Sequence, residues 1–571
     1  MGSGKTALPP VWRRHAVLTV LFVAFGMTAA RVVHLQMTES DHLRAQGDSR
    51  YLRDVVVLPQ RGRILDRNGQ VLSVSTPVSS IWAEPARFCA SRDQWKPMLE
   101  LLKLRKKTLL AACERRQDAE FMYVKRRLVP SLAEEVMALN IPGLEVQREY
   151  KRYYPGGPVS AHLVGFTNVD DQGQEGLERF YNDHLSGKAG KKRVLKDLKG
   201  HYVETVESIR QVDHGRDLVV SIDQRIQSMA SAYLEQAVTE HNAAGGSVVV
   251  LSIPSGEILA MVNSPQFNPN DRSTLKKGVF RNRAVTDIME PGSTAKPFTV
   301  AMALESGKIG PETLVETSPG YHRVGGRTIH DVRDYGEITV FDVIAKSSNV
   351  GSAKIALAFP FDSLYDTYRD VGFGSSTRTL PDEISGSLYR RERAIEHATM
   401  SYGYGFSATP LQLARAYTTF ATDGTVLPVT LEKKSDDFAA QGSRIFSPDT
   451  VFAMRPMLEK AASAEGTASR AVIPRYRVGG KTGTTHKLIN GNYNNNRYQS
   501  VFAGIAPLSN PQFVMVVMVD DPRGKRYYGG DVAAPVFSAL MKDLVRLYNV
   551  KPDKPVSTQL SGLRDQSEAT L

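Results

Sequence analysis

Three short motifs contain the residue types that acyl transfer requires. They are Ser293-Thr294-Ala295-Lys296, Ser347-Ser348-Asn349 and Lys481-Thr482-Gly483-Thr484. A serine hydroxyl is a weak nucleophile at neutral pH unless a base lies beside it. On a helix, a spacing of three residues places Lys296 on the same face as Ser293. The first motif therefore predicts a nucleophilic serine with a lysine as its base.

The residues around the first motif predict the start of a helix. Pro291-Gly292 interrupts the chain immediately before it, and Pro297 is compatible only with a first helical turn. Free backbone N–H groups at a helix N-terminus favour a developing oxyanion. The apolar run 298–304 follows, and burial among apolar residues lowers the pKa of a lysine enough to make it a neutral base.

The third motif predicts a strand that binds substrate. Gly483 would let a substrate backbone approach closely. The hydroxyls of Thr482 and Thr484, with the ammonium of Lys481, can bind a carboxylate. Taken alone, 347–349 would be a helix cap and 481–483 a surface turn. Their order after an SxxK motif is instead typical of the serine acyl-enzymes.

Two other short motifs do not indicate function. A second SxxK pattern, Ser273-Thr274-Leu275-Lys276, lies in a polar loop and is followed by Lys277-Gly278 rather than by an apolar helix. The segment Gly2-Ser3-Gly4-Lys5-Thr6 resembles the end of a phosphate-binding loop. It lacks the first glycine of that motif and a preceding strand, so we expect no nucleotide site there.

The surrounding pattern predicts an α+β catalytic domain. A helix is expected from Asp223, and the region between two groups of strands is expected to be mainly helical. Strands at both ends of such a region indicate an antiparallel sheet covered by helices. The predicted strands are Leu218–Ile222, Ser247–Ile253, Glu257–Val262, Ser500–Ala506 and Gln512–Val519.

Residues 37–215 form a mixed α/β region that we expect to serve in interactions or as a spacer, and we call it the pedestal. Asn68-Gly69 predicts a hairpin turn, residues 98–140 show helical spacing, and Lys191-Lys192-Arg193 predicts a solvated basic stretch. The expected order is a cytoplasmic tail (1–15), an anchor (16–36), this pedestal, a catalytic domain (216–551) and a disordered polar tail (552–571).

The apolar stretch that begins at Ala16 is long enough to cross a bilayer, for which about 20 residues are needed. Arg13 and Arg14 precede it, which predicts a cytoplasmic N-terminus and a single pass, with the rest of the chain outside the cytoplasm. The alternative is a cleaved signal peptide that ends at Thr28-Ala29-Ala30. We favour the uncleaved anchor because the apolar residues continue past that point.

The overall composition excludes several classes of protein. A hydrophobic fraction of 42% and a charged fraction of 23% are those of a globular protein. The net charge of +12 suits anionic lipid or an anionic wall polymer, and no basic run with interleaved aromatics indicates nucleic acid. Cys89 and Cys113 could form one bridge or remain free thiols, and their spacing predicts no metal site. We expect no cofactor and no metal.

Beyond these motifs, the chain resembles the class B penicillin-binding proteins, in the septal (cell-division) branch of Gram-negative bacteria. Asn349 is typical of that branch, whereas the elongation branch usually has aspartate there. The resemblance covers nearly the whole chain. Its other motifs are Arg61-Gly62, Asp66-Arg67-Asn68-Gly69, Tyr154-Pro155, 161–165, 173–178, Tyr402-Gly403-Tyr404-Gly405 and 409–414.

The resemblance implies a peptidoglycan D,D-transpeptidase. Ser293 would attack the penultimate D-alanine of a stem pentapeptide, releasing D-alanine, and Lys296 would accept its proton. Ser347 and Asn349 would relay a proton and orient the substrate. Lys481 would support that relay, with Thr482, Gly483 and Thr484 at the substrate carboxylate. These are the catalytic and substrate-binding residues that the resemblance implies: Ser293, Lys296, Ser347, Asn349, Lys481, Thr482, Gly483 and Thr484.

The resemblance also implies partners and a location. The N–H groups of Ser293 and Thr484 would form the oxyanion hole, and β-lactams would acylate Ser293. The pedestal would contact a glycan polymerase of the SEDS type and divisome proteins at the septum, from the bacterial inner membrane with the catalytic domain in the periplasm. The alternatives are a D,D-carboxypeptidase or other serine acyl-enzyme hydrolase, and an elongation-type relative.

Overall fold

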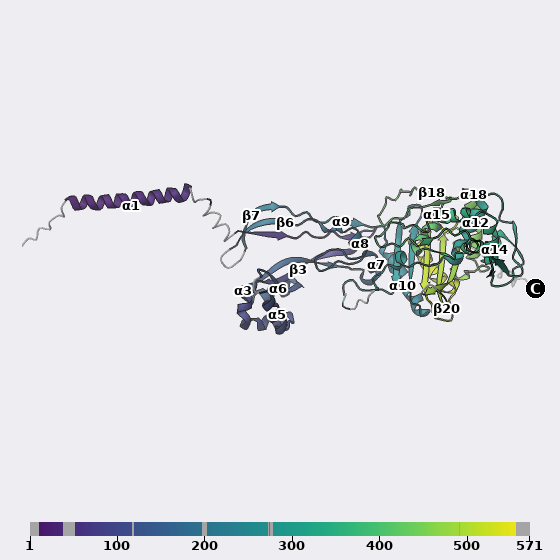
Figure 1. The fold of residues 1–571 in the computed structure, drawn as a ribbon, viewed down its shortest axis with the longest axis horizontal. Coiled ribbons are helices and arrows are strands. Elements are labelled where there is room, and N and C mark those ends of the chain that lie inside the picture. The colour runs from purple at the N-terminus through teal and green to yellow at the C-terminus, as the bar shows by residue number, and fades with distance from the viewer. Residues whose placement is uncertain are drawn as a thin grey trace, which may run out of the picture. The chain divides into compact units, whose positions relative to one another are not determined.

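The computed structural model of the chain describes residues 11–37, 41, 52–116, 119–196, 202–271, 273, 278–489 and 492–555. Figure 1 shows their arrangement as a ribbon. Two compact units are present. One contains residues up to Gln60 together with Gly187–Gly215, and the other contains Arg61–Ser186 and Arg216 onward. The tail predicted after residue 552 lies outside the described residues from residue 556.

Helix α1 (Val11–Met37) has the length and composition of a membrane span. Its mean hydropathy over the best window is 2.1, and none of that window is buried in the protein. The helix begins at Val11, five residues before the predicted anchor, and its first turn contains Arg13 and Arg14. So many exposed apolar side chains are stable only in a lipid environment. The helix therefore has the properties of a membrane anchor.

The first unit also contains a three-stranded antiparallel sheet of order β1-β6-β7. The basic residues 191–193 lie in its central strand, where Lys192 is exposed and Lys191 and Arg193 are partly exposed, so the stretch is solvated as predicted. Lys191 and Arg193 both form ion pairs with Asp54 on the neighbouring strand β1. The strands are β1 (Leu52–Val57), β6 (Gly190–Lys196) and β7 (Tyr202–Arg210).

In the second unit, residues 61–186 contain a sheet whose central strand is β3, which pairs with β2, β4 and β5. The predicted Asn68-Gly69 turn joins β2 to β3. Residues 98–140 are not continuously helical, because β4 lies among the helices and pairs with β3. The strands are β2 (Ile64–Leu65), β3 (Val71–Ala83), β4 (Met122–Leu128) and β5 (Leu144–Tyr153).

Short helices cover this sheet and lead to the catalytic domain. They are α3 (Pro85–Phe88), η1 (Cys89–Gln94), α4 (Trp95–Leu102), α5 (Lys106–Arg115), α6 (Pro130–Met137), η2 (Gly157–Ser160), α7 (Ala161–Val164), α8 (Gly176–Phe180) and α9 (Asn182–Ser186). A buried ion cluster joins α8 to β5 and to the segment before β2. Glu178, which is fully buried, accepts hydrogen bonds from Arg61 at 2.7 Å and from Arg152 at 2.6 Å. Buried charges are tolerated only when they are paired in this way.

The catalytic domain is built on a five-stranded antiparallel sheet of order β10-β9-β21-β20-β19 (Figure 1). As predicted, the two early strands pair with each other and the late strands join the same sheet. β19, which carries the third motif, forms one edge. The strands are β9 (Gly245–Ser252), β10 (Ile258–Ser264), β19 (Gly479–Ile489), β20 (Asn492–Ala506) and β21 (Phe513–Asp520).

Helices cover both faces of this sheet, which is why its central strands are apolar at nearly every position. Alternate residues of each strand enter two different cores. On one face, Val249 and Val516 pack with α12 (Lys296–Glu305) and α17 (Pro410–Ala421). On the other face, Val250 and Val517 pack with α10 (Gln224–Glu240) and α20 (Ala534–Leu547). The sheet is therefore a rigid frame for the residues at its edge.

The region between the early and late strands is mainly helical, as predicted, with small two-stranded pairs. Its elements are α11 (Arg283–Thr286), η3 (Gly292–Ala295), α12 (Lys296–Glu305), β11 (Leu314–Glu316), β12 (Tyr321–Val324), β13 (Arg327–His330), β14 (Glu337–Thr339), α13 (Val340–Ala345), α14 (Asn349–Leu357), α15 (Phe361–Asp370), β15 (Ser387–Leu388), α16 (Ala394–Met400), β16 (Phe406–Ser407), α17 (Pro410–Ala421), β17 (Thr425–Val426), β18 (Ser443–Arg444), α18 (Pro448–Ala461) and η4 (Ser469–Ala471). The flanking elements are β8 (Leu218–Val219), α10 (Gln224–Glu240), α19 (Gly529–Val532) and α20 (Ala534–Leu547).

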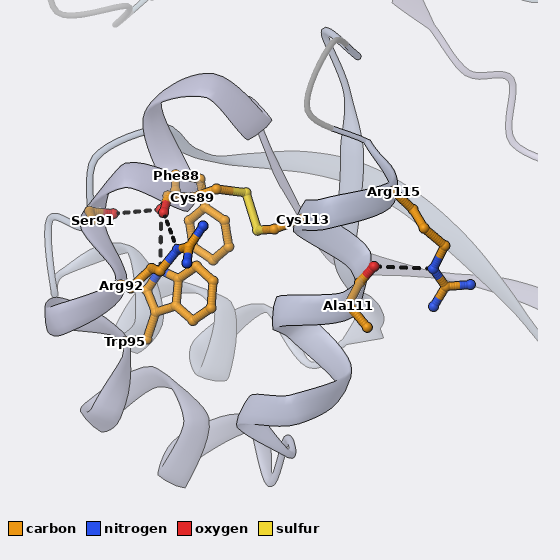
Figure 2. Close-up of a disulfide and its surroundings, with 8 residues drawn as sticks. All are labelled: Phe88, Cys89, Ser91, Arg92, Trp95, Ala111, Cys113 and Arg115. Carbon is orange, nitrogen blue, oxygen red and sulfur yellow. Dashed lines mark hydrogen bonds between the residues drawn. A yellow bond between two sulfur atoms is a disulfide. The ribbon is translucent and has the colours of Figure 1, made fainter.

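The two cysteines form a disulfide (Figure 2). Of the two predicted alternatives, a bridge or two free thiols, the structure therefore contains the bridge. Cys89 and Cys113 are 24 residues apart and join η1 to α5. The bridge lies against a buried stack in which Phe88 and Trp95 have ring centroids 4.6 Å apart. It reinforces a small core made of short helices, which would otherwise depend on few apolar residues.

Removing this bridge should destabilise the pedestal. Closing a loop of this length lowers the free energy of the native state relative to the unfolded chain by about 3 kcal/mol. We expect the double variant Cys89→Ser/Cys113→Ser to unfold at a lower urea concentration. Tryptophan fluorescence will report this, because Trp82 and Trp95 both lie in this region. Reductant should shift the urea unfolding curve of the wild-type protein onto that of the variant. If the wild-type and variant unfolding curves coincide before reduction, the expectation is wrong.

Candidate active site

Ser293 lies at the start of the helical segment, as predicted, in η3 immediately before α12. The preceding Gly292 has a φ of +56°, a conformation that favours glycine. Its N–H donates to the carbonyl of Gly403 at 3.0 Å. A Cβ atom on Gly403 would lie 2.1 Å from the carbonyl oxygen of Gly292. This close backbone contact fixes the turn that presents the serine.

Lys296 is the centre of the site and is fully buried. Its Nζ lies 3.1 Å from the Oγ of Ser293. It donates to the backbone oxygen of Ser347 at 2.6 Å and to the Oδ1 of Asn349 at 2.7 Å, and it lies 3.1 Å from the Oγ of Ser347. One amine therefore joins the first motif to the second.

The second motif forms the N-terminus of α14. Ser348 is the N-cap, and its Oγ accepts from the N–H of Gly351 at 2.8 Å. Ser347, just before it, has a φ of +61°, which is strained for a residue other than glycine. This conformation turns both the carbonyl and the hydroxyl of Ser347 toward Lys296. The strain is therefore located at the contact with the base.

Asp331 supports this helix terminus, and sequence analysis did not identify it. Its carboxylate accepts from the Oγ of Ser348 at 2.5 Å, from the N–H of Val350 at 3.1 Å, and from the N–H of Asn349. A carboxylate at a helix N-terminus is favoured by the free N–H groups and the dipole. Asp331 is thus a positioning residue for Asn349. An isolated Asp in a loop gives no signal of such a role.

The third motif lies on β19, at the edge of the sheet, as predicted. A Cβ atom on Gly483 would lie 2.8 Å from the carbonyl oxygen of Pro291 and 3.1 Å from the side chain of Thr294. Only glycine therefore lets this strand approach the nucleophile segment so closely. The sequence predicts that Gly483 lets a substrate backbone approach this strand closely. The structure shows that Gly483 also lets η3 approach the strand closely.

The side chains of the third motif form a cluster of hydroxyls around Lys481. Lys481 is fully buried, and its Nζ donates to Thr467 at 3.4 Å and to Thr482 at 3.3 Å. The Oγ1 atoms of Thr467 and Thr482 are 2.9 Å apart. The Oγ1 of Thr484 accepts from the N–H of Gly529 at 2.9 Å. Thr467 and Gly529 come from other elements and belong to no motif.

Burial changes the ionisation of both lysines. Desolvation lowers the pKa of Lys296 well below its ordinary value, and the nearby charge of Lys481 lowers it further, whereas Asp331 raises it. Burial lowers the pKa of Lys481 to about 7. Lys296 is therefore suited to act as a neutral base, and Lys481 exists in both protonation states near neutral pH.

The serine of the second SxxK pattern, which we call the decoy serine, lies outside this site. Ser273 is exposed, and its Oγ donates to the Oδ1 of Asp271 at 2.7 Å. Lys276, the lysine of that pattern, lies outside the described residues. All eight residues predicted for the site lie together around Ser293, on η3, α12, α14 with the residues just before it, and β19.

This arrangement of a helix-terminal serine, a buried lysine beside it and an edge strand rich in hydroxyls defines a serine-type acyltransferase. Comparison with protein families agrees. Residues 246–542 match the penicillin binding protein transpeptidase domain, and residues 56–220 match the penicillin-binding protein dimerisation domain. The chain belongs to the class B penicillin-binding proteins, the family of peptidoglycan D,D-transpeptidases.

Named relatives match over almost their whole length. The peptidoglycan D,D-transpeptidase FtsI of Escherichia coli K12 is 40% identical over 95% of this chain and 93% of its own. The probable peptidoglycan D,D-transpeptidase PenA of Neisseria meningitidis is 39% identical over 95% and 94%. Among solved structures, the transpeptidase domain of penicillin-binding protein 3 of Burkholderia pseudomallei is 41% identical, with a TM-score of 0.55, covering 59% of this chain and 98% of its own.

Replacing Asp331 should slow acylation without unfolding the protein. In Asp331→Asn, the loss of charge weakens three hydrogen bonds to the start of α14, and charge-assisted bonds contribute about 1.5–3 kcal/mol each. We expect the second-order rate constant for acylation by a fluorescent penicillin to fall about tenfold or more. Glu312→Gln, which changes an exposed carboxylate of the same domain, is the control. Equal rates in the two variants would exclude a positioning role for Asp331.

Proposed function

We propose that this protein cross-links peptidoglycan stem peptides through an acyl-enzyme at Ser293. The contact between the Nζ of Lys296 and the Oγ of Ser293, at 3.1 Å with the amine fully buried, carries the proposal. A neutral amine has two N–H groups and a lone pair. The N–H groups match the oxygens of Ser347 and Asn349, which leaves the lone pair for the serine proton.

In the acylation step, the Oγ of Ser293 attacks the carbonyl carbon of the penultimate D-alanine while its proton passes to Lys296. The tetrahedral intermediate collapses with cleavage of the C–N bond. The departing D-alanine takes a proton, which Ser347 can pass from Lys296 because its Oγ lies 3.1 Å from the Nζ. Asn349 orients the substrate amide. A β-lactam follows the same path, but its amine stays attached after the ring opens.

The third motif binds the substrate carboxylate in this proposal. The hydroxyl of Thr484 accepts from the N–H of Gly529 and therefore has its own proton free to donate. Thr482 is placed likewise, beside the ammonium of Lys481. The N–H groups of Ser293 and Thr484 would hold the oxyanion, supported by the short approach of β19 to η3 at Gly483.

A second stem peptide completes the reaction. Its amine, on a diamino acid such as diaminopimelate, attacks the ester and forms the cross-link while Ser293 regains its proton. The similarity to D,D-transpeptidases supports transfer to an amine rather than hydrolysis. A D,D-carboxypeptidase would use water at this step, and the rate of deacylation separates the two.

We infer that the catalytic domain works outside the cytoplasm, from the inner membrane. The apolar part of helix α1 follows Arg13 and Arg14 in its first turn, and the disulfide suits an oxidising compartment. The likeness to FtsI supports a role at the division septum with a SEDS-type polymerase and divisome proteins. We place the boundary between pedestal and catalytic domain at residues 215 and 216, and the anchor within 16–36.

Ser293→Ala should abolish covalent labelling by fluorescent penicillin, because the Oγ of Ser293 supplies the attacking oxygen in this mechanism. Labelling is read on a denaturing gel, and Ser273→Ala, which changes the decoy serine, is the control. Persistent labelling of Ser293→Ala would disprove the assignment. The wild-type label should last for many minutes, whereas loss within seconds would indicate a hydrolase.

Acylation should depend on pH through both lysines. The rate requires neutral Lys296, so it should rise with pH through the lowered pKa of that amine. Carboxylate binding requires charged Lys481, so the rate should fall above about pH 7. Second-order rate constants for the free enzyme report these two pKa values.

Lys481→Arg provides the matched variant, because a guanidinium stays charged across this range. We expect the alkaline decrease to disappear while the acidic limb remains. The measurement is the acylation rate between pH 5.5 and 9.5. An unchanged alkaline limb in Lys481→Arg would show that Lys481 does not cause it.

A further inference from the structure

A cavity lies within the larger unit and is lined by residues other than those of the active site. Its volume is about 330 Å³. One wall comes from the segment around α7 and α8, and the other comes from the catalytic domain at α11 and at residues 380–382. The interior is apolar and is formed by Phe280, Val285 and Leu380, with the ring of His162 beside them. Burial lowers the pKa of His162 to about 4, so this ring is neutral at physiological pH.

The walls of the cavity are held in place independently of any ligand. The carboxylate of Glu383 accepts from the N–H groups of Thr379 and Leu380 at 2.6 and 2.8 Å. The amide of Gln412 donates to the carbonyls of Ser375 and Ser385 at 2.7 Å each. These bonds fix the loop that carries Leu380. A cavity with fixed walls binds without the cost of ordering them.

Four charged side chains surround the mouth of the cavity, and three of them form ion pairs. Arg179 pairs with Asp382 at 3.3 Å, and Arg281 pairs at 2.7 Å with Asp287, which also pairs with Arg283. The fourth is Glu175, whose carboxylate forms no hydrogen bond or ion pair within the described part of the chain. Burial and the nearby charge of Asp382 raise the pKa of Glu175, whereas the charge of Arg179 lowers it to a smaller extent. The rim therefore presents one unsatisfied carboxylate beside an apolar interior.

We propose that this cavity binds an aromatic side chain that is followed by a lysine or arginine on a partner protein. The apolar walls would accept the ring, and the cationic neighbour would pair with Glu175 at the rim. The volume lies at the lower end of ligand cavities and suits one anchoring side chain. Buried aromatic anchors with charged neighbours are typical of protein interfaces. The proposal does not depend on the function proposed for Ser293.

Disulfide tethering tests this proposal in the full-length protein. Both native cysteines are bonded to each other, so Thr286→Cys introduces a single free thiol on the cavity wall. The probes are acetyl-Trp-Lys, acetyl-Trp-Glu and acetyl-Ala-Lys, each carrying the same mercaptoethylamide tether. Capture is measured by intact mass spectrometry as β-mercaptoethanol is increased within the range that leaves the Cys89–Cys113 bridge oxidised, and peptide mapping assigns the adduct to position 286. Unchanged labelling of Ser293 by fluorescent penicillin will show that each variant is folded.

We expect the Trp-Lys probe to withstand about three- to fivefold more reductant than either of the other two probes, the effect of a modest ion pair added to an apolar contact. Adding Glu175→Gln should remove the preference for Trp-Lys over Trp-Glu and leave the preference for Trp over Ala. Ser435→Cys, an exposed site beside Asp436 and Asp437, should show no preference for Trp. Equal capture of all three probes by the Thr286→Cys variant, or a charge preference that survives Glu175→Gln, would overturn the proposal.

Discussion

The constraint on which the site depends is the complete burial of two lysines close enough to repel each other. Neither Lys296 nor Lys481 exposes any surface. Burying an ammonium without a counter-charge is so unfavourable that the amine loses its proton instead. In the proposed mechanism, the protein thereby obtains its base at neutral pH from a lysine rather than from a histidine. The oxygens of Ser347 and Asn349 accept hydrogen bonds from Lys296, so the amine keeps these two partners when it loses a proton.

That burial requires the three motif segments to approach one another more closely than ordinary side chains allow. Gly292, Gly403 and Gly483 remove the Cβ atoms that would collide with neighbouring backbone or side chains. The five-stranded sheet, packed on both faces, keeps β19 from moving away from η3. Catalytic geometry is therefore a product of the whole domain, since the serine segment, α14 and β19 come from distant parts of the chain and meet only when the two cores form.

The sequence predicted those parts of the structure whose signal is local. The spacing of Ser293 and Lys296, the Pro291-Gly292 break and the apolar strands each follow from short-range rules, and the structure places them as predicted. Residues brought in from elsewhere carried no such signal. Asp331, Thr467 and Gly529 act at the site only because tertiary packing brings them there. In the same way, the strand Met122–Leu128 is specified by its pairing with β3, which overrides the helical spacing around it.

In the proposed mechanism, the site is divided into a base region and a carboxylate region, and this division would explain why it contains two lysines rather than one. Lys296 would have to be neutral to accept a proton, whereas attraction of a carboxylate requires a cation. One amine cannot meet both requirements at the same pH. Placing the second amine on the edge strand, among hydroxyls and not beside a carboxylate, leaves it able to gain a proton when an anionic substrate arrives. The charge of the substrate itself then completes the electrostatic balance of the site, which favours ligands that carry a carboxylate next to the scissile amide.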